Sequence, residues 1–238
     1  MRPLSGGRFA VTVSWRLAAF VGLSLAGPWI ATTIQNATEC TGTEGACAGI
    51  SVATGTLLRP LILVLLALAL LRPCWRRMRT LGMWGIAGWL VPALLLLDWR
   101  TLTAFGLHYV PVSFGLGLLN SGFPFFTVLA ILIVGLLVLA HPPAARGDSL
   151  WRRHGIVGQI GWLAALVAVV AGAVSTVLYL LLAQSIATVG FGSPLFGQAI
   201  LAGKVGVIAS LVAIAGVLWM IAAEHVHRPA AVAPEEAA

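Results

Sequence analysis

One stretch, residues 56–80 (TLLRPLILVLLALALLRPCWRRMRT), limits what this chain can fold into more than any other. Leu61 to Leu71 is an uninterrupted run of eleven apolar residues, and four arginines follow it within the next eight positions. Together with the less apolar turns before it, the run predicts one membrane-spanning helix that ends in a strongly basic loop. Because cationic loops stay on the cytoplasmic side during insertion, this loop predicts the orientation of every other segment.

Composition excludes a soluble protein. The chain has 238 residues, of which 60% are hydrophobic and 9% charged, and its mean hydropathy is +1.01. Soluble domains carry about 25% charged residues, so this chain could not cover a water-facing surface. The formal net charge is +7, but the arginines lie in short loops between apolar runs, where they set topology. We therefore expect the lipid bilayer, and no nucleic acid, as a partner.

The apolar runs predict an all-α integral membrane protein, a bundle of six transmembrane helices with both termini cytoplasmic in the plasma membrane. The predicted spans cover residues 17–34, 51–71, 81–97, 123–140, 156–184 and 198–222. This arrangement places every strongly basic loop on one side. Residues 1–222 are then a single transmembrane domain, and residues 223–238, rich in Pro and Ala, form a short disordered cytoplasmic tail.

Residues 101–120 are moderately apolar but are interrupted by His108 and Pro111. If this segment spanned the membrane, the later loop that contains Arg146, Arg152 and Arg153 would lie outside, against the charge rule. We therefore predict an interfacial or re-entrant segment on the outer face, which must be buried in protein or line a wet cavity.

Three cysteines are present. Cys40 and Cys47 lie in a polar segment that is predicted to be outside, where disulfides persist. We predict a bridge between them; a metal site, the alternative, would need two further ligands, and none is obvious nearby. Cys74 lies beside the four arginines of the first basic loop, an environment that predicts a lowered thiol pKa.

The last two predicted helices carry small residues three and four positions apart. These are Gly158, Gly161, Ala165, Ala168 and Gly172 in the fifth helix and Ala202, Gly206, Ser210, Ala213 and Gly216 in the sixth. Small residues let helices approach closely in lipid, so we expect the two helices to pack on each other or on a neighbouring subunit. Other membrane subunits, or a homo-oligomer, are the expected protein partners. The alternative is that Gly and Ala are simply abundant here.

Motifs for chemistry are scarce. The chain lacks G-x-S-x-G, H-E-x-x-H, a Walker loop and paired intramembrane carboxylates, so catalysis is disfavoured. The histidines fall at predicted membrane edges: His141, His154, His225 and His227 on the cytoplasmic side and His108 on the outer side. A haem held between facing histidines is therefore not expected, and we predict no cofactor and no metal.

One polar set falls in or near the predicted outer half of the membrane. It consists of Arg59, Asp98, Arg100, His108, Gln184, Gln198 and Lys204. Buried charges in membranes mark functional cavities, so these groups predict an outward-facing polar cavity for a small or amphiphilic ligand, with Asp98 paired to Arg59 or Lys204. The alternative is that the long side chains snorkel and one ion pair links two helices.

Two function classes follow. The first is a membrane transport or permease component that binds a small or amphiphilic ligand in this cavity. The alternative is a non-catalytic structural subunit of a larger membrane complex. A membrane-embedded enzyme acting on lipid or isoprenoid is disfavoured by the shortage of acid and base residues.

Overall fold

The computed structural model describes residues 5–38, 46–97, 125–142, 149–189 and 194–226, and this part of the chain is helical throughout, apart from turns. The predicted all-α class is therefore confirmed. Four helices are long: α1 (Gly6–Ala37), α2 (Ala46–Thr80), α7 (Gly155–Val189) and α8 (Pro194–Val226). Four are short: η1 (Gly85–Trp89), α3 (Leu90–Leu97), α5 (Phe125–Leu139) and α6 (Leu150–Arg153).

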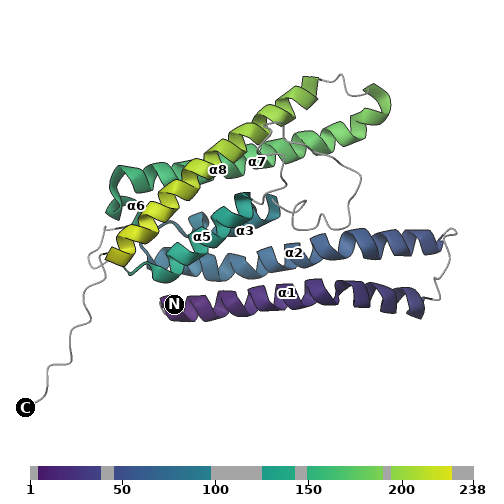
Figure 1. Ribbon diagram of the computed structural model, residues 1–238, viewed down its shortest axis with the longest axis horizontal. Helices are drawn as coiled ribbons and strands as arrows, with labels where there is room; N and C mark the ends of the chain where they lie inside the picture. Colours follow the sequence, from purple (N-terminus) through teal and green to yellow (C-terminus); the bar gives the residue numbers. More distant parts are fainter. Residues whose placement is uncertain (1–4, 39–45, 98–124, 143–148, 190–193, 227–238) are drawn as a thin grey trace, which may run out of the picture.

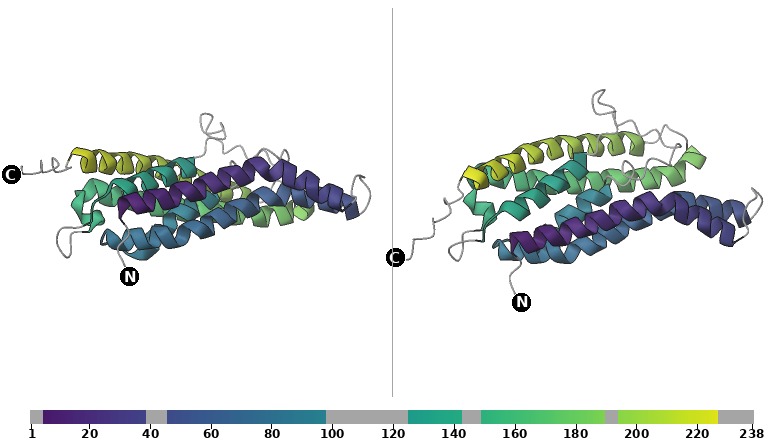
Figure 2. Two further views of the ribbon diagram at one scale, coloured as in Figure 1. Left: turned by 90° about the horizontal axis from the view of Figure 1, so that it is seen from below. Right: turned by 60° about the horizontal axis from the view of Figure 1, so that its bottom comes forward.

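The long helices form two antiparallel hairpins, α1 with α2 and α7 with α8, and the shorter helices lie between them (Figures 1 and 2). Helix α3 touches α2, α5 and α7, while α5 packs on α8 and also touches α1. The two hairpins are thus joined through α3 and α5.

Five helix termini gather at one end of the molecule: the starts of α1 and α7 and the ends of α2, α5 and α8 (Figure 1). We call this the basic end, because it carries the arginines of the first basic loop together with Arg8 and Arg153. The opposite end, where α1 and α7 finish and α2 and α8 begin, is called the far end. This up-and-down order agrees with the predicted order of spans.

Three helices are long and apolar enough to cross a membrane, namely Gly6–Gly27 in α1, Gly155–Leu178 in α7 and Gly197–Val226 in α8. Large apolar side chains such as Trp15 and Leu25 are more than 70% exposed, as suits a lipid-facing surface. The protein is therefore membrane-associated. Helix α5 is about 22 Å long at 1.5 Å per residue, less than the ~30 Å apolar core of a bilayer. The six-span count, the plasma membrane and the orientation stay predictions.

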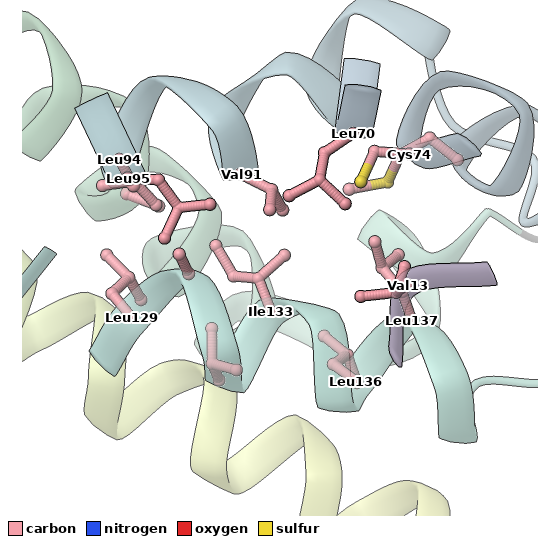
Figure 3. Packing of buried hydrophobic residues seen from close by; sticks show 14 of the residues in the cluster. Val13, Leu70, Cys74, Val91, Leu94, Leu95, Leu129, Ile133, Leu136 and Leu137 are labelled. Carbon is pink, nitrogen blue, oxygen red and sulfur yellow. The ribbon is translucent and has the colours of Figure 1, made fainter. Parts of the chain in front are cut away.

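The core between the hairpins is built from leucine-rich faces. Val91 and Leu94 of α3 point toward Leu129 and Ile133 of α5, and Leu70 of α2 lies beside them (Figure 3). All five side chains are buried. These contacts anchor the short helices on which the candidate site is built.

Cys74 belongs to the same core and is fully buried. Burial raises the pKa of the Cys74 thiol to about 12, although Arg16 opposes the shift. The expectation of a lowered pKa was wrong, because the thiol points into the apolar core (Figure 3). Desolvation then outweighs the nearby charge.

The predicted third helix, residues 81–97, is divided into a turn, η1 and α3. Helix α2 ends in a Schellman motif, in which Met83 N–H donates to Met78 C=O at 3.1 Å and Gly82 N–H to Arg79 C=O at 3.3 Å. Gly82 occupies the left-handed position with φ 74°, which glycine adopts at no steric cost. The chain therefore reverses at Gly82 before it can continue as a helix.

Close approach to α2 explains why the next turn is a 3₁₀ helix. A Cβ at Gly88 would lie 2.5 Å from the carbonyl carbon of Cys74, and a Cβ at Gly85 would lie 2.7 Å from the ring of Trp75. Residues three apart eclipse one another in a 3₁₀ helix, so both glycines face α2 at the same time. Their missing side chains let η1 lie directly on α2.

The small-residue faces of α7 and α8 pack on each other within the chain. A Cβ at Gly216 would lie 2.6 Å from the Cα of Gly161, and one at Gly206 would lie 3.3 Å from the backbone N of Gly172. The predicted close approach of these helices is confirmed, and these residues are used inside one molecule. An oligomer through α7 and α8 stays a prediction and would have to use their outer faces.

Three further predictions concern the Cys40–Cys47 bridge, residues 101–120 and the C-terminal tail. Cys47 lies in the first turn of α2, whereas Cys40 lies outside the described residues, so the Cys40–Cys47 bridge stays a prediction. The 101–120 segment also lies outside them. Helix α8 continues to Val226, so the first four residues of the predicted tail are helical.

Candidate functional site

An apolar pocket of about 810 Å³ opens between the turn that follows α2, η1, α3 and α7. It lies toward the basic end, because its walls include the reversal after α2 and the start of α6. The lining residues are Gly82, Met83, Trp84, Ile86, Ala87, Trp89, Leu90, Ala93, Ser149, Trp162, Leu163, Leu166 and Val169. Nearly all of these are apolar or aromatic, so the pocket suits an apolar ligand or the apolar part of an amphiphile.

The walls come from two separate parts of the sequence. The Schellman turn and the two glycines of η1 fold residues 82–93 back along α2, and the rings of Trp75 and Trp89 contact each other at 5.7 Å between centroids. Leu163 and Leu166 of α7 form the opposite wall. Leu150 N–H donates to Leu81 C=O at 3.3 Å, which ties the two parts together at the basic end.

Trp162 places one polar group in this apolar wall. Its side chain is 3% exposed, and its indole Nε1 makes no hydrogen bond within the described residues. Because Nε1 itself has almost no accessible surface, it is buried behind the pocket wall and is not open to a ligand in the pocket.

An exposed arginine precedes the turn that contributes to the pocket. Arg79 is exposed and lies one turn before Gly82, whose N–H donates to its C=O. It follows Trp75 by four positions and so shares its helix face.

A second group of polar residues meets around Glu224, near the end of α8. The Glu224 carboxylate, 6% exposed, lies 3.1 Å from Arg153 Nη1, 3.3 Å from His154 Nε2 and 3.4 Å from His141 Nδ1. Arg153 also donates to the backbone C=O of His141 at 3.2 Å. Glu224 thus holds together the end of α5, the start of α7 and the end of α8.

Arg77 plays a structural part at the same end. The side chain is 1% exposed and donates from Nε to Leu137 C=O at 2.7 Å and from Nη2 to Ala140 C=O at 2.5 Å. Leu137 lies in the last turn of α5 and Ala140 directly follows the helix, where carbonyls lack intrahelical donors. Burial lowers the pKa of Arg77 from its ordinary value, yet arginine keeps its proton at any working pH.

The structure describes the side chains of few members of the predicted polar set. Asp98, Arg100 and His108 lie outside the described residues, and Arg59 and Gln184 lie in α2 and α7 without described side chains. Gln198 is exposed and Lys204 half-buried on α8. The outward polar cavity and the Asp98 pairing therefore stay predictions.

Sequence reasoning missed both the pocket and the Glu224 group. The GIAG spacing of Gly85 and Gly88 was a signal for a close helix approach, and Glu224 is a carboxylate two positions after the predicted span 198–222. Within the described residues, no group of three or more His, Cys, Asp or Glu side chains is placed to hold a metal ion.

No family model, no curated protein and no solved structure matches the chain. Function is therefore inferred from the pocket and its surroundings.

Proposed function

We propose that the protein is a membrane transport or permease component that binds a small or amphiphilic ligand in the pocket between η1, α3 and α7. The pocket carries this proposal. Its volume of about 810 Å³ lies in the range of ligand sites, which are mostly apolar with a few placed polar groups.

The lining supports entry of the ligand from the bilayer. Trp84 is 86% exposed, Ile86 60% and Leu163 52%, so the pocket walls continue into the apolar outer surface of the helices. An amphiphile dissolved in the membrane could enter sideways without crossing water. The predicted polar set toward the far end would then serve a second step of the transport path.

Movement of an amphiphile between leaflets tests the proposal. Protein is reconstituted into liposomes with a single-chain amphiphile that carries an NBD fluorophore, and dithionite reduces the fluorophore on the outside. Transport makes the protected fraction decay faster than in empty liposomes. Leu166→Trp should slow this decay about tenfold, because the larger side chain fills part of the pocket, and a loss of about 1.4 kcal/mol in ligand binding corresponds to a factor of ten.

Leu211→Trp is the matched control, because Leu211 is similarly exposed on α8, 44% against 50% for Leu166, and does not line the pocket. It should behave like the wild type. Equal rates for wild type and Leu166→Trp, or for wild type and empty liposomes, would exclude transport through this pocket.

The second candidate is a non-catalytic subunit of a larger membrane complex, and α1 favours it. In its most apolar window 12% of the residues are buried inside the molecule, against 44% for α8. A partner subunit would cover Trp15 and Trp29, both more than 70% exposed. Protection of a Trp29→Cys thiol from a lipid-soluble maleimide in native membranes, lost on purification in mild detergent, would support this function over the first.

A further inference from the structure

We infer that His141 and Glu224 form a proton-binding site at the basic end, and that the bound proton strengthens a latch that holds α6 beside the pocket. The latch is the contact of Arg153 in α6 with Glu224 of α8 and with the chain that follows α5. The inference goes beyond the proposed function and rests on it only for the statement that the pocket takes a ligand. Its own basis is the geometry around the Glu224 carboxylate.

The two carboxylate oxygens of Glu224 meet different partners. Arg153 Nη1 lies 3.1 Å and His154 Nε2 3.3 Å from Oε1, whereas His141 Nδ1 lies 3.4 Å from Oε2. The Glu224 side chain is 5% exposed, so water screens these contacts only weakly. The guanidinium of Arg153 favours the ionised carboxylate, and Oε2 can therefore accept a charge-assisted hydrogen bond from His141.

His141 is the histidine of this group that water can reach. Its side chain is 53% exposed, whereas that of His154 is 4% exposed. Histidine changes its charge between about pH 5 and pH 8. A neutral ring donates from Nδ1 in only one of its two tautomers, but a protonated ring donates from both nitrogens. Protonation of His141 therefore turns a hydrogen bond into an ion pair, and this pair is lost as pH rises and the ring loses its charge.

Two arginines beside this site keep their charge across that range. Arg153 also donates to the backbone C=O of His141 at 3.2 Å. From α2, Arg77 donates to the C=O of Ala140, one residue before His141. Both guanidiniums oppose a further positive charge, but each already donates to an oxygen. The Glu224 carboxylate is in direct contact with the ring of His141, so its attraction outweighs this repulsion.

Helix α6 connects this site to the pocket. Arg153 is its last residue, and at its other end Leu150 N–H donates to Leu81 C=O at 3.3 Å. Gly82, which follows Leu81, and Ser149, which precedes α6, both line the pocket. When the latch weakens, α6 is held less firmly, and the wall of the pocket at the basic end opens more often. The proton thus regulates access of the ligand to the pocket.

Hydrogen exchange of the full chain in detergent, read by mass spectrometry, tests the latch without any ligand. The quantity compared is the protection factor, which is the intrinsic exchange rate divided by the observed rate, so the chemical effect of pH is removed. For residues 150–158 it should fall about fivefold from about pH 5.5 to about pH 8, the factor that corresponds to about 1 kcal/mol at 25 °C. Residues 207–217, in the middle of α8, should show no change.

His141→Gln keeps a hydrogen-bonding side chain without the charge, and it should abolish the fall. His225→Gln is the matched control, because His225 is an exposed histidine next to Glu224 on α8, and it should keep the fall. Arg153→Gln should lower protection at both pH values, since it removes the part of the latch that does not titrate. The wild-type comparison needs no variant, so it decides the matter even if one of them fails to fold.

The outcomes separate this inference from the proposed function. A wild-type protection factor that is the same at both pH values, or a fall that persists in His141→Gln, would overturn the proton site and leave the pocket in place. An equal fall in residues 207–217 would show that the whole molecule loosens, and would also overturn it. Failure of transport in liposomes would instead remove the proposed function and leave the exchange result unchanged.

Discussion

At the scale of single residues, the basic end contains arginines with three different surroundings. Arg77 is buried and donates to the carbonyl of Leu137 in α5, Arg153 is paired with Glu224, and Arg79 is exposed. In the sequence these three residues are equivalent as topogenic charges. They differ because helix faces and chain reversals give each one a different neighbour.

Glu224 is expected to be the most sensitive charge at this end. Replacing it as Glu224→Gln removes the carboxylate that faces Arg153, His154 and His141, and leaves a partly buried arginine without its counter-charge. Breaking a buried pair from one side costs about 3 kcal/mol. Urea unfolding in detergent, followed by circular dichroism, measures this loss. The same change at Glu39, which lies in a predicted wet loop, should have almost no effect, and equal stabilities of the two variants would contradict the role of Glu224.

At the scale of elements, apolar runs were sufficient to predict the long helices. Residues 51–71, 156–184 and 198–222 all fall within α2, α7 and α8, because length and hydropathy are local properties of a sequence. The Glu224 contacts were not predictable in this way, since His141 lies 83 positions earlier in the chain. Pairing over that distance depends on how α5, α7 and α8 pack, which a single sequence does not reveal.

The divided third helix, residues 81–97, was predictable only in part. Gly82, Gly85 and Gly88 were visible in the sequence, yet the run 81–97 was apolar enough to suggest one continuous span. Gly85 and Gly88 lack side chains where η1 lies close to Trp75 and to the backbone of Cys74. This is a tertiary contact, which the hydropathy of the sequence does not show. The pocket exists because of this division, so it could not be predicted from hydropathy.

The contact between α7 and α8 leads to a second prediction. Gly216→Ala would place a methyl group 2.6 Å from the Cα of Gly161, and backbone cannot yield as a flexible side chain does. We expect destabilisation by about 1–3 kcal/mol, the usual cost of overpacking. Gly135→Ala in α5 is the control: its Cβ would meet nothing within 4 Å, and Ala is favoured over Gly in a helix by about 1 kcal/mol. Melting temperatures in detergent should therefore move in opposite directions, and a fall in both would count against the close contact.

At the scale of the whole molecule, charge is distributed unevenly along the long axis. Apart from Arg59, the described arginines lie toward the basic end, where five helix termini also lie. Anionic lipids on the cytoplasmic leaflet attract such a surface, and the positive-inside rule predicts that it faces the cytoplasm.

This orientation can be tested with thiols placed at the two ends. The native Cys74 is a poor reporter, because it is fully buried and its thiol pKa is raised to about 12, so almost no reactive thiolate exists at pH 8. In a chain whose native cysteines are replaced by alanine, Pro142→Cys adds an exposed thiol at the basic end and Thr38→Cys adds one at the far end. A membrane-impermeant maleimide should label Thr38→Cys in intact cells and Pro142→Cys only after the cells are opened. Labelling of Pro142→Cys in intact cells would reverse the predicted orientation.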